Sequence, residues 1–193
     1  MSAPLAVKWC GKRYTSGMTV ATPDTISATT LVEIQQRLGR PPRGLEAVAL
    51  YGTDGGPMVI RVASLVEGKP FPNLFWLIDP ALVYRIDCDE AGGLIQRLQK
   101  RVDACQELRE AMVADHYAFI ELRNQYMNPS IKKQLHELRY FELLQQRGIG
   151  GIADFSRVRC LHTWYAAHLI VPNTIGGLLH EYWAEIDGVK PVT

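Results

Sequence analysis

The sequence lacks several features that define large protein classes. Its four cysteines, at positions 10, 88, 105 and 160, form no C-x-x-C pair, the spacing typical of zinc ribbons and thioredoxin-like proteins. The N-terminus shows no basic segment followed by an apolar one, so we expect reduced thiols in a cytoplasmic protein. No apolar run, AAHLIV being the longest candidate, reaches the length of a bilayer span, and we expect no membrane association.

An excess of charge is also missing. Lys and Arg total 21 and Asp and Glu total 20, which gives a formal net charge of +1. Nucleic-acid-binding proteins usually carry a basic excess or a basic stripe. The candidate stripe here, Lys132-Lys133 with Arg139 and Arg147, is interspersed with acids. We therefore do not expect nucleic acid as a partner.

The common catalytic motifs are absent. The chain has no G-x-S-x-G elbow, no H-E-x-x-H pair and no protein-kinase set. The glycine-rich sequence at 148–151 lacks the Lys-Ser/Thr of a phosphate-binding P-loop, so we expect a hinge there. These motifs decide neither whether the protein is an enzyme nor which cofactor it uses.

What is present predicts an α+β fold, with a small N-terminal antiparallel sheet packed against a helical C-terminal half. Residues 1–28 are expected to form an irregular arm, and residues 29–193 a single domain with its sheet at about 45–80 and its helices at about 81–187. Three strand-like runs, EAVALY, PMVIRVASL and LFWLI, are joined by connections too short for crossover helices. The sheet is therefore predicted to be antiparallel.

The helices are predicted from apolar spacing and capping residues. In TTLVEIQQRLG, Thr30 with Glu33 has the capping-box pattern, and Gly39 suits the end of the helix. The acids Asp87, Asp89 and Glu90 are typical of a helix start. Further helices are expected over SIKKQLHELRYFELLQQR, DFSRVRCLHTWYAAHLIV and NTIGGLLHEYWAEI, the last with Asn173 as N-cap.

The sequence RVRCLHTWYAAHLIVPN is the strongest candidate for chemistry, because Cys160, His162 and His168 lie within nine positions. If residues 154–171 form one helix, each residue turns by about 100° and rises by about 1.5 Å. The two histidines then flank an apolar face on opposite sides, and Cys160 points away from both. These three residues cannot form a metal site by themselves, so we expect none unless other segments add ligands.

Two hypotheses stay open. In the first, the protein is an enzyme or small-ligand-binding protein that acts on an anionic small molecule, with proton transfer through His162. Its candidate catalytic residues are His162, His168 and Cys160, and its candidate ligand-binding residues are Arg40, Arg43, His116 and Asn173. In the second, the histidines and the thiol are buried core residues. The long helices at 90–146 then serve a protein partner or a homo-oligomer.

Several short motifs in order resemble a known family. RLGRPPRG, GGPMVIRVASLVEGKPFPNLFWLIDP, ADHYAFIELR and GIADFSRVRCLHTWYAAHLIVPNTIGG are similar to family 501 of the bacterial domains of unknown function. The resemblance implies kinship without an activity. The family pattern, with three cysteines and histidines, would suit a metal or thiol cluster. This chain has Tyr51-Gly52 and Asp79 where that pattern has cysteine, so the resemblance implies that such a cluster is lost here or uses Asp79 in place of one cysteine.

Overall fold

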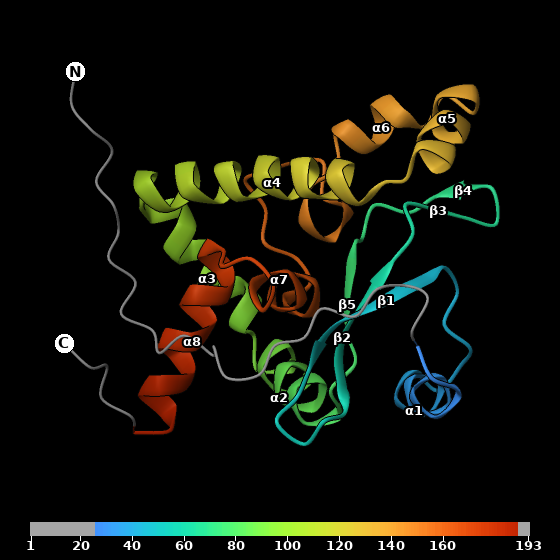
Figure 1. Ribbon diagram of the computed structural model, residues 1–193. Coiled ribbons are helices and arrows are strands. Elements are labelled where there is room, and N and C mark those ends of the chain that lie inside the picture. Colours follow the sequence, from blue (N-terminus) through green and yellow to red (C-terminus); the bar gives the residue numbers. More distant parts are fainter. Residues whose placement is uncertain (1–25, 189–193) are drawn as a thin grey trace.

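The computed structural model of the protein describes residues 26–188, so the predicted arm at residues 1–28 lies almost entirely outside the described residues. The fold is α+β, as predicted, and a small antiparallel sheet precedes a helical C-terminal half (Figure 1). In chain order the elements are α1 (Ala28–Leu38), β1 (Leu45–Tyr51), β2 (Pro57–Val62), β3 (Leu65–Val66), β4 (Lys69–Pro70), β5 (Phe75–Leu77), α2 (Pro80–Ala91), α3 (Leu94–Ala104), α4 (Gln106–Tyr126), α5 (Pro129–Glu137), α6 (Phe141–Gln145), the 3₁₀ turn η2 (Ile149–Gly151), α7 (Leu161–His168) and α8 (Thr174–Ile186).

The main sheet has the strand order β1-β2-β5, and both pairings are antiparallel. β1 and β2 are joined by the turn at 52–56, where the Asp54 side chain accepts a hydrogen bond from the backbone of Gly56. β3 and β4 form a separate two-stranded hairpin. Short connections therefore give the antiparallel pairing that the sequence predicts.

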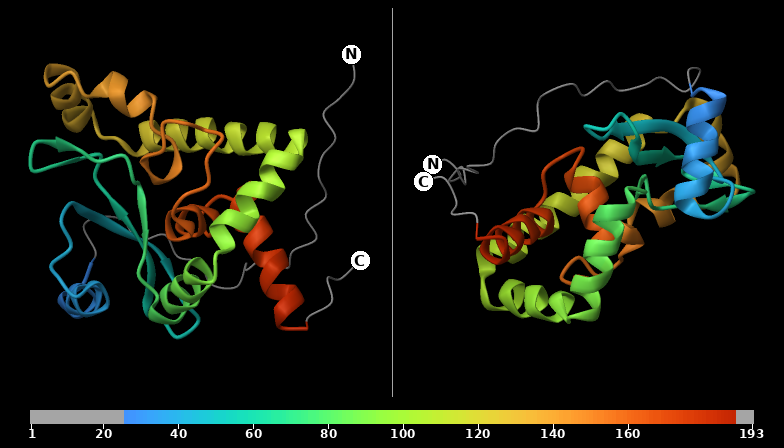
Figure 2. Two further views of the ribbon diagram at one scale, coloured as in Figure 1. Left: turned by 180° about the vertical axis from the view of Figure 1, so that it is seen from behind. Right: turned by 90° about the horizontal axis from the view of Figure 1, so that it is seen from below.

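Both faces of this sheet are covered, because neighbouring residues of a strand point to opposite sides. Val59 of β2 belongs to the large core that the C-terminal helices share, whereas the next residue, Ile60, packs in a smaller core with Ile34 of α1. Figure 1 and Figure 2 show α1 on one side of the sheet and α7 with α2 on the other. The sheet thus separates α1 from the helices that carry the candidate histidines.

Helix α1 begins earlier than its sequence suggests. Ser27, and not Thr30, is the N-cap and accepts a hydrogen bond from the backbone of Thr30, whereas Gly39 ends the helix in the left-handed conformation as expected. Thr30 has the right type for a cap, but Ser27 offers the same hydroxyl one turn earlier. The capping-box prediction is therefore wrong by three residues.

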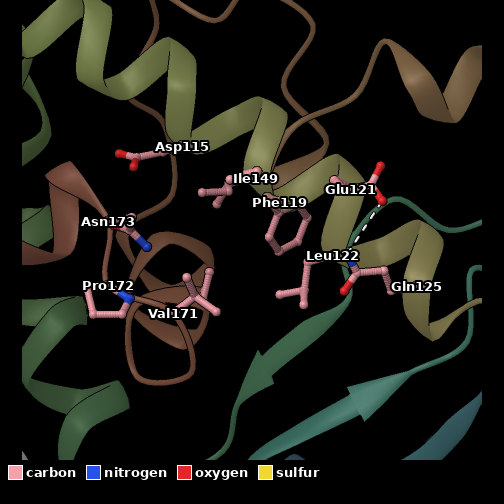
Figure 3. Close-up of a pocket in the computed structure, with 11 residues that line it drawn as sticks. Asp115, Phe119, Glu121, Leu122, Gln125, Ile149, Val171, Pro172 and Asn173 are labelled. Atoms are coloured by element: carbon pink, nitrogen blue, oxygen red, sulfur yellow. Dashed lines mark hydrogen bonds between the residues drawn. The ribbon is translucent and has the colours of Figure 1, made fainter. Parts of the chain in front are cut away.

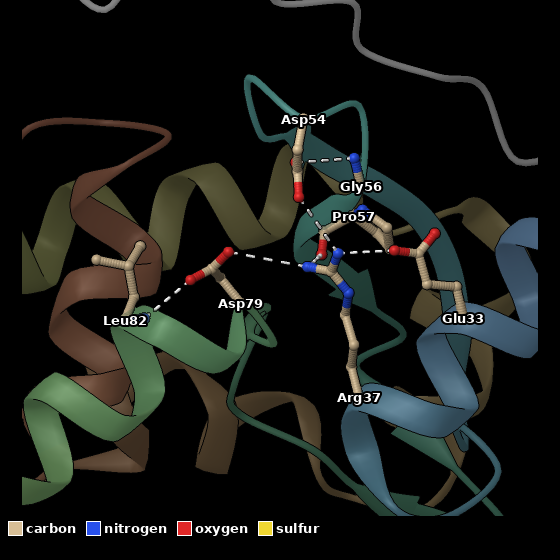
Figure 4. A network of polar contacts seen from close by, with 7 residues as sticks. All are labelled: Glu33, Arg37, Asp54, Gly56, Pro57, Asp79 and Leu82. Atoms are coloured by element: carbon tan, nitrogen blue, oxygen red, sulfur yellow. Dashed lines mark hydrogen bonds and ion pairs between the residues drawn. The ribbon is translucent and has the colours of Figure 1, made fainter.

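Arg37 ties α1 to the sheet and to α2 (Figure 4). Its guanidinium lies 2.7 Å from the Glu33 carboxylate and 3.8 Å from those of Asp54 and Asp79, and it donates to the carbonyl of Pro57. Asp79 is also the N-cap of α2, where it accepts a hydrogen bond from the backbone of Leu82. The Asp79 carboxylate thus has a structural role, because it contacts Arg37 and caps α2.

Two other helix predictions need correction. The predicted helix after Asn128 is interrupted at Arg139, whose φ of 58° is left-handed, and it becomes α5 and α6. The acids Asp87, Asp89 and Glu90 lie in the last turns of α2 and not at a helix start, because Asp79 and Pro80 begin that helix earlier.

The helix predicted at 154–171 is shorter and begins only at Leu161. Two side chains from distant helices hold the preceding segment in a non-helical conformation: Gln99 of α3 accepts the backbone N–H of Val158, and Glu90 of α2 accepts that of Leu161. These long-range bonds replace the local helical bonds that the apolar spacing favours. They also set the position of Cys160 just before the helix.

Within residues 26–188, no helix has both the length and the apolar character that a bilayer span requires.

Candidate functional site

Three potential ligand atoms meet where α7 begins. The Cys160 sulfur lies 3.7 Å from Nδ1 of His162, and the same nitrogen lies 3.4 Å from Oε1 of Glu90. All three atoms lie within 4.8 Å of one another. Glu90 comes from α2 and the other two residues from the start of α7, so the site joins segments about 70 positions apart in the sequence. The group is half-buried, with 21% of the His162 side chain and 25% of the Glu90 side chain exposed.

The other ring nitrogen of His162 faces a second set of acceptors. Nε2 lies 3.3 Å from the Asp87 carboxylate and 3.3 Å from the backbone carbonyl of Val83. The hydrogen bond with the Cys160 sulfur is the main cause that raises the pKa of His162 to about 9. The charges on Cys160 and Glu90 and the Val83 carbonyl raise this pKa further, whereas burial opposes the shift. The imidazole is therefore held between negative groups on both of its nitrogen atoms.

This geometry corrects the helical-wheel argument for Cys160. Because α7 begins at Leu161, Cys160 is its N-cap residue with extended backbone, and its side chain turns toward His162 instead of away from it. The sequence argument required ligands from another segment before a metal site could form. Glu90, from α2, supplies such a potential ligand atom.

His168 lies apart from this group, at the other end of α7. Its Nδ1 accepts a hydrogen bond from the backbone of Asn173, and its ring packs against His180 and Tyr165. Burial, with a smaller effect of the nearby His180, lowers the pKa of His168 to about 4. Among residues 26–188, no hydrogen bond, ion pair or ring contact joins His168 to Cys160 or His162.

His116 and Asn173 make buried structural contacts. Nδ1 of His116 accepts the backbone N–H of Ile149, and its ring stacks on Phe155. Asn173 is the N-cap of α8, as predicted, where it accepts from Gly176 and donates its side-chain amide to the carbonyl of Trp164.

Arg40 and Arg43 lie away from His162 and His168. The Arg40 guanidinium lies over the ring of Trp76, which packs with the core on the α1 side of the sheet. Arg43 forms an ion pair of 3.3 Å with Glu67, and both side chains are about two-thirds exposed. The sheet lies between this loop and α7 (Figure 1).

Trp183 and Phe141, two aromatic residues of the C-terminal half, are packed against other side chains. Trp183 is buried and donates its indole N–H to Asp89. Phe141 is partly buried beside Leu144. Tyr84 and Tyr117 are the large aromatics most open to solvent among the described residues, with 71% and 61% exposed.

Sequence comparison places this site within a known family. The pattern of the family described as "Protein of unknown function (DUF501)" matches residues 48–181, which is more than half of the chain. The chain belongs to this family. No curated protein and no solved structure matches it. The DUF501 match includes Glu90, Cys160 and His162, whereas Arg40 and Arg43 lie before its first residue.

The potential ligand group in this DUF501 protein consists of Glu90, Cys160 and His162 and does not include Asp79. Asp79 contacts Arg37 and caps α2, so it does not replace a cysteine beside Cys160. The sequence does not indicate Glu90 and Asp87 as site residues, because neighbouring acids are typical of a helix start. The spacing of these two acids does carry information, because residues three positions apart lie on the same face of any helix that contains both.

Proposed function

We propose that the protein is a zinc-dependent enzyme whose metal ion is held by Oε1 of Glu90, Sγ of Cys160 and Nδ1 of His162. One observation carries the proposal. Ligands about 2.0–2.3 Å from a zinc ion at the corners of a tetrahedron are about 3.3–3.8 Å apart. The Cys160–His162 and His162–Glu90 distances of 3.7 and 3.4 Å match these tetrahedral edges.

The types of ligand support zinc among the divalent ions. A thiolate, an imidazole and a carboxylate all bind Zn²⁺, whereas Mg²⁺ and Ca²⁺ prefer oxygen ligands. Metal-binding histidines usually donate their second ring nitrogen to a carboxylate or a carbonyl. Asp87 and Val83 offer both kinds of acceptor to Nε2 of His162.

The balance of charge favours a metal over an empty thiol site. Asp87 and Glu90 bring two carboxylates to a single imidazole. An ionised Cys160 would add a third negative group beside Glu90, at a cost that rises with burial. A divalent cation between Glu90, Cys160 and His162 would offset that repulsion.

Three protein ligands leave a fourth position open, as in catalytic zinc sites. Zinc at such a position lowers the pKa of a bound water to about 7 or polarises a substrate oxygen. A small anionic molecule remains the substrate class that we propose, because an open metal position attracts negatively charged oxygen. Arg157 and Arg159, both exposed, precede Cys160 in the sequence and add positive charge nearby. Arg40 and Arg43 are not part of this proposal.

A second candidate function is catalysis by the Cys160 thiolate without a metal. Cys160 is the N-cap of α7 and contacts His162, and both a helix N-terminus and an imidazolium activate thiols. In this case Glu90 and Asp87 would orient the imidazole.

Zinc titration of metal-free protein against a chromophoric competitor tests the first proposal. We expect one Zn²⁺ to bind, and we expect each of Glu90→Gln, Cys160→Ser and His162→Asn to weaken it by about 100-fold or more. Asp87→Asn should weaken it by about 10–100-fold, as loss of a group behind a metal ligand usually does. Cys88→Ser is the matched control, because it removes an exposed thiol from the same helix as Glu90.

Cobalt substitution provides an independent signature, since a cobalt–thiolate bond gives a charge-transfer band that Cys160→Ser removes. Equal zinc affinity in the wild type and all three ligand variants would refute the metal site. If zinc does not bind and iodoacetamide modifies Cys160 faster than Cys88 in a His162-dependent manner, the thiol enzyme is the better description.

A further inference from the structure

A cavity lies between α4 and the segment that follows α7 (Figure 3). It has a volume of about 250 Å³. Its walls are apolar, with Phe119 and Leu122 from α4, Ile149 from η2, and Val171 and Pro172 from the segment before α8. None of the residues that form the proposed zinc site lines it.

The polar side of this cavity is acidic. Asp115 lines it near the start of α8, where the carboxylate accepts the backbone N–H of Thr174 at 2.7 Å, and Glu121 lies at the rim beside Gln125. None of the described residues that line the cavity is basic. Among residues 26–188, Asp115 also has no ion-pair partner within 4.0 Å. The start of α8 offsets part of the cost of burying this carboxylate, because Thr174 is the first residue of that helix, but it supplies no full positive charge.

Burial raises the pKa of Asp115, and hydrogen bonds from Thr174 only partly oppose this effect. A cation placed beside the carboxylate would therefore recover more free energy than it would at an exposed acid, because the local dielectric is lower. The neighbouring polar group, Asn173, cannot serve as that partner, since its side chain already bonds Gly176 and Trp164.

We propose that this cavity binds a small organic amine, with its apolar part against Phe119, Leu122 and Val171 and its ammonium group at Asp115. The size is suitable, because an apolar cavity of about 150 Å³ accommodates benzene. A volume of about 250 Å³ is enough for one ring with a short aminoalkyl arm. The proposal does not depend on the zinc site, since the two share no residue.

Phenethylamine and its neutral isostere 2-phenylethanol test both parts of the proposal, with binding followed by NMR shifts of the α4 and Val171 amides. We expect the amine to bind about tenfold more tightly than the alcohol, the ratio expected for a charge-assisted hydrogen bond. Phenylacetate should bind more weakly than either. Equal affinity for the amine and the alcohol would overturn the role of Asp115.

Two variants separate the effect of the Asp115 charge on binding from the effect of the cavity's shape. Asp115→Asn keeps an oxygen acceptor for Thr174 while it removes the charge, so it should abolish the amine's advantage and leave the alcohol's affinity unchanged. Ala118→Trp, at an exposed position on the rim, should block both ligands. Glu110→Gln removes an exposed acid of the same helix outside the cavity and should change neither. Binding that survives Ala118→Trp would place the ligand elsewhere and refute the proposal.

Discussion

Acid should destabilise the protein through His116, which is fully buried against Phe155 and Trp164. Its Nδ1 accepts the backbone N–H of Ile149 at 3.0 Å, so the neutral ring carries its proton on Nε2. Protonation of Nδ1 would turn this acceptor into a donor facing another donor. Burial lowers the pKa of His116 to about 4, from an ordinary value of 6.5.

The pKa of His116 is lower in the folded protein than in the unfolded chain. The contribution of neutral His116 to stability is therefore fully present above pH 6.5 and is lost as the pH falls toward 4. With these two values, the free energy of unfolding should fall by about 2 kcal/mol between pH 8 and pH 5 from this group alone. The full loss, at still lower pH, is about 3 kcal/mol.

Urea denaturation at pH 8, 6.5 and 5 measures the effect when the wild type is compared with His116→Asn. The asparagine oxygen can still accept from Ile149 but does not titrate in this range. The variant should be less stable at pH 8, by about 2–4 kcal/mol for a lost buried ring, and this gap should narrow by about 2 kcal/mol at pH 5. Other titrating groups are common to both proteins and cancel in the difference.

Parallel stability profiles for the two proteins would show that His116 is not the titrating group. If the variant is too unstable for denaturation at pH 5, NMR titration of the His116 ring in the wild type decides the question directly. A pKa near 6.5 in the folded protein would contradict the reasoning.

Three further predictions concern single contacts. Gly176→Ala should destabilise by about 3 kcal/mol or more, because a Cβ there would overlap Cγ of the His168 ring; an unchanged midpoint in thermal unfolding would show that the ring moves aside at no cost. Asp79→Ala should cost about 1–2 kcal/mol through loss of the α2 cap to Leu82, and in urea denaturation Asp79→Asn, which can still cap, should recover most of it. Metal-free protein should lose stability as the pH rises from 6.5 toward 9, because the pKa of His162 is raised in the folded protein and protonated His162 contributes fully to stability only below pH 6.5. If a His162→Asn variant showed the same fall in unfolding free energy with rising pH, this reasoning would be contradicted.

The sequence by itself determined the features that depend on near neighbours. Alternation along β2 predicted a strand, and in the structure Val59 and Ile60 face opposite cores. Gly39 and Asn173 predicted the end of α1 and the start of α8. Such signals are readable because strand periodicity and capping involve residues only a few positions apart. The family resemblance likewise came from short local motifs, and it is confirmed over residues 48–181.

Only the tertiary structure decided the site. The apolar spacing before Cys160 favoured a helix, but backbone hydrogen bonds to the side chains of Gln99 and Glu90 keep that segment non-helical, and the helix starts only at Leu161. The same Glu90 then completes a group with Cys160 and His162 from about 70 positions away. No local pattern encodes this contact, because it depends on how α2 packs against α7 and not on the spacing of residues within either segment. For the same reason the sequence could not show that the sheet lies between Arg40 and the histidines.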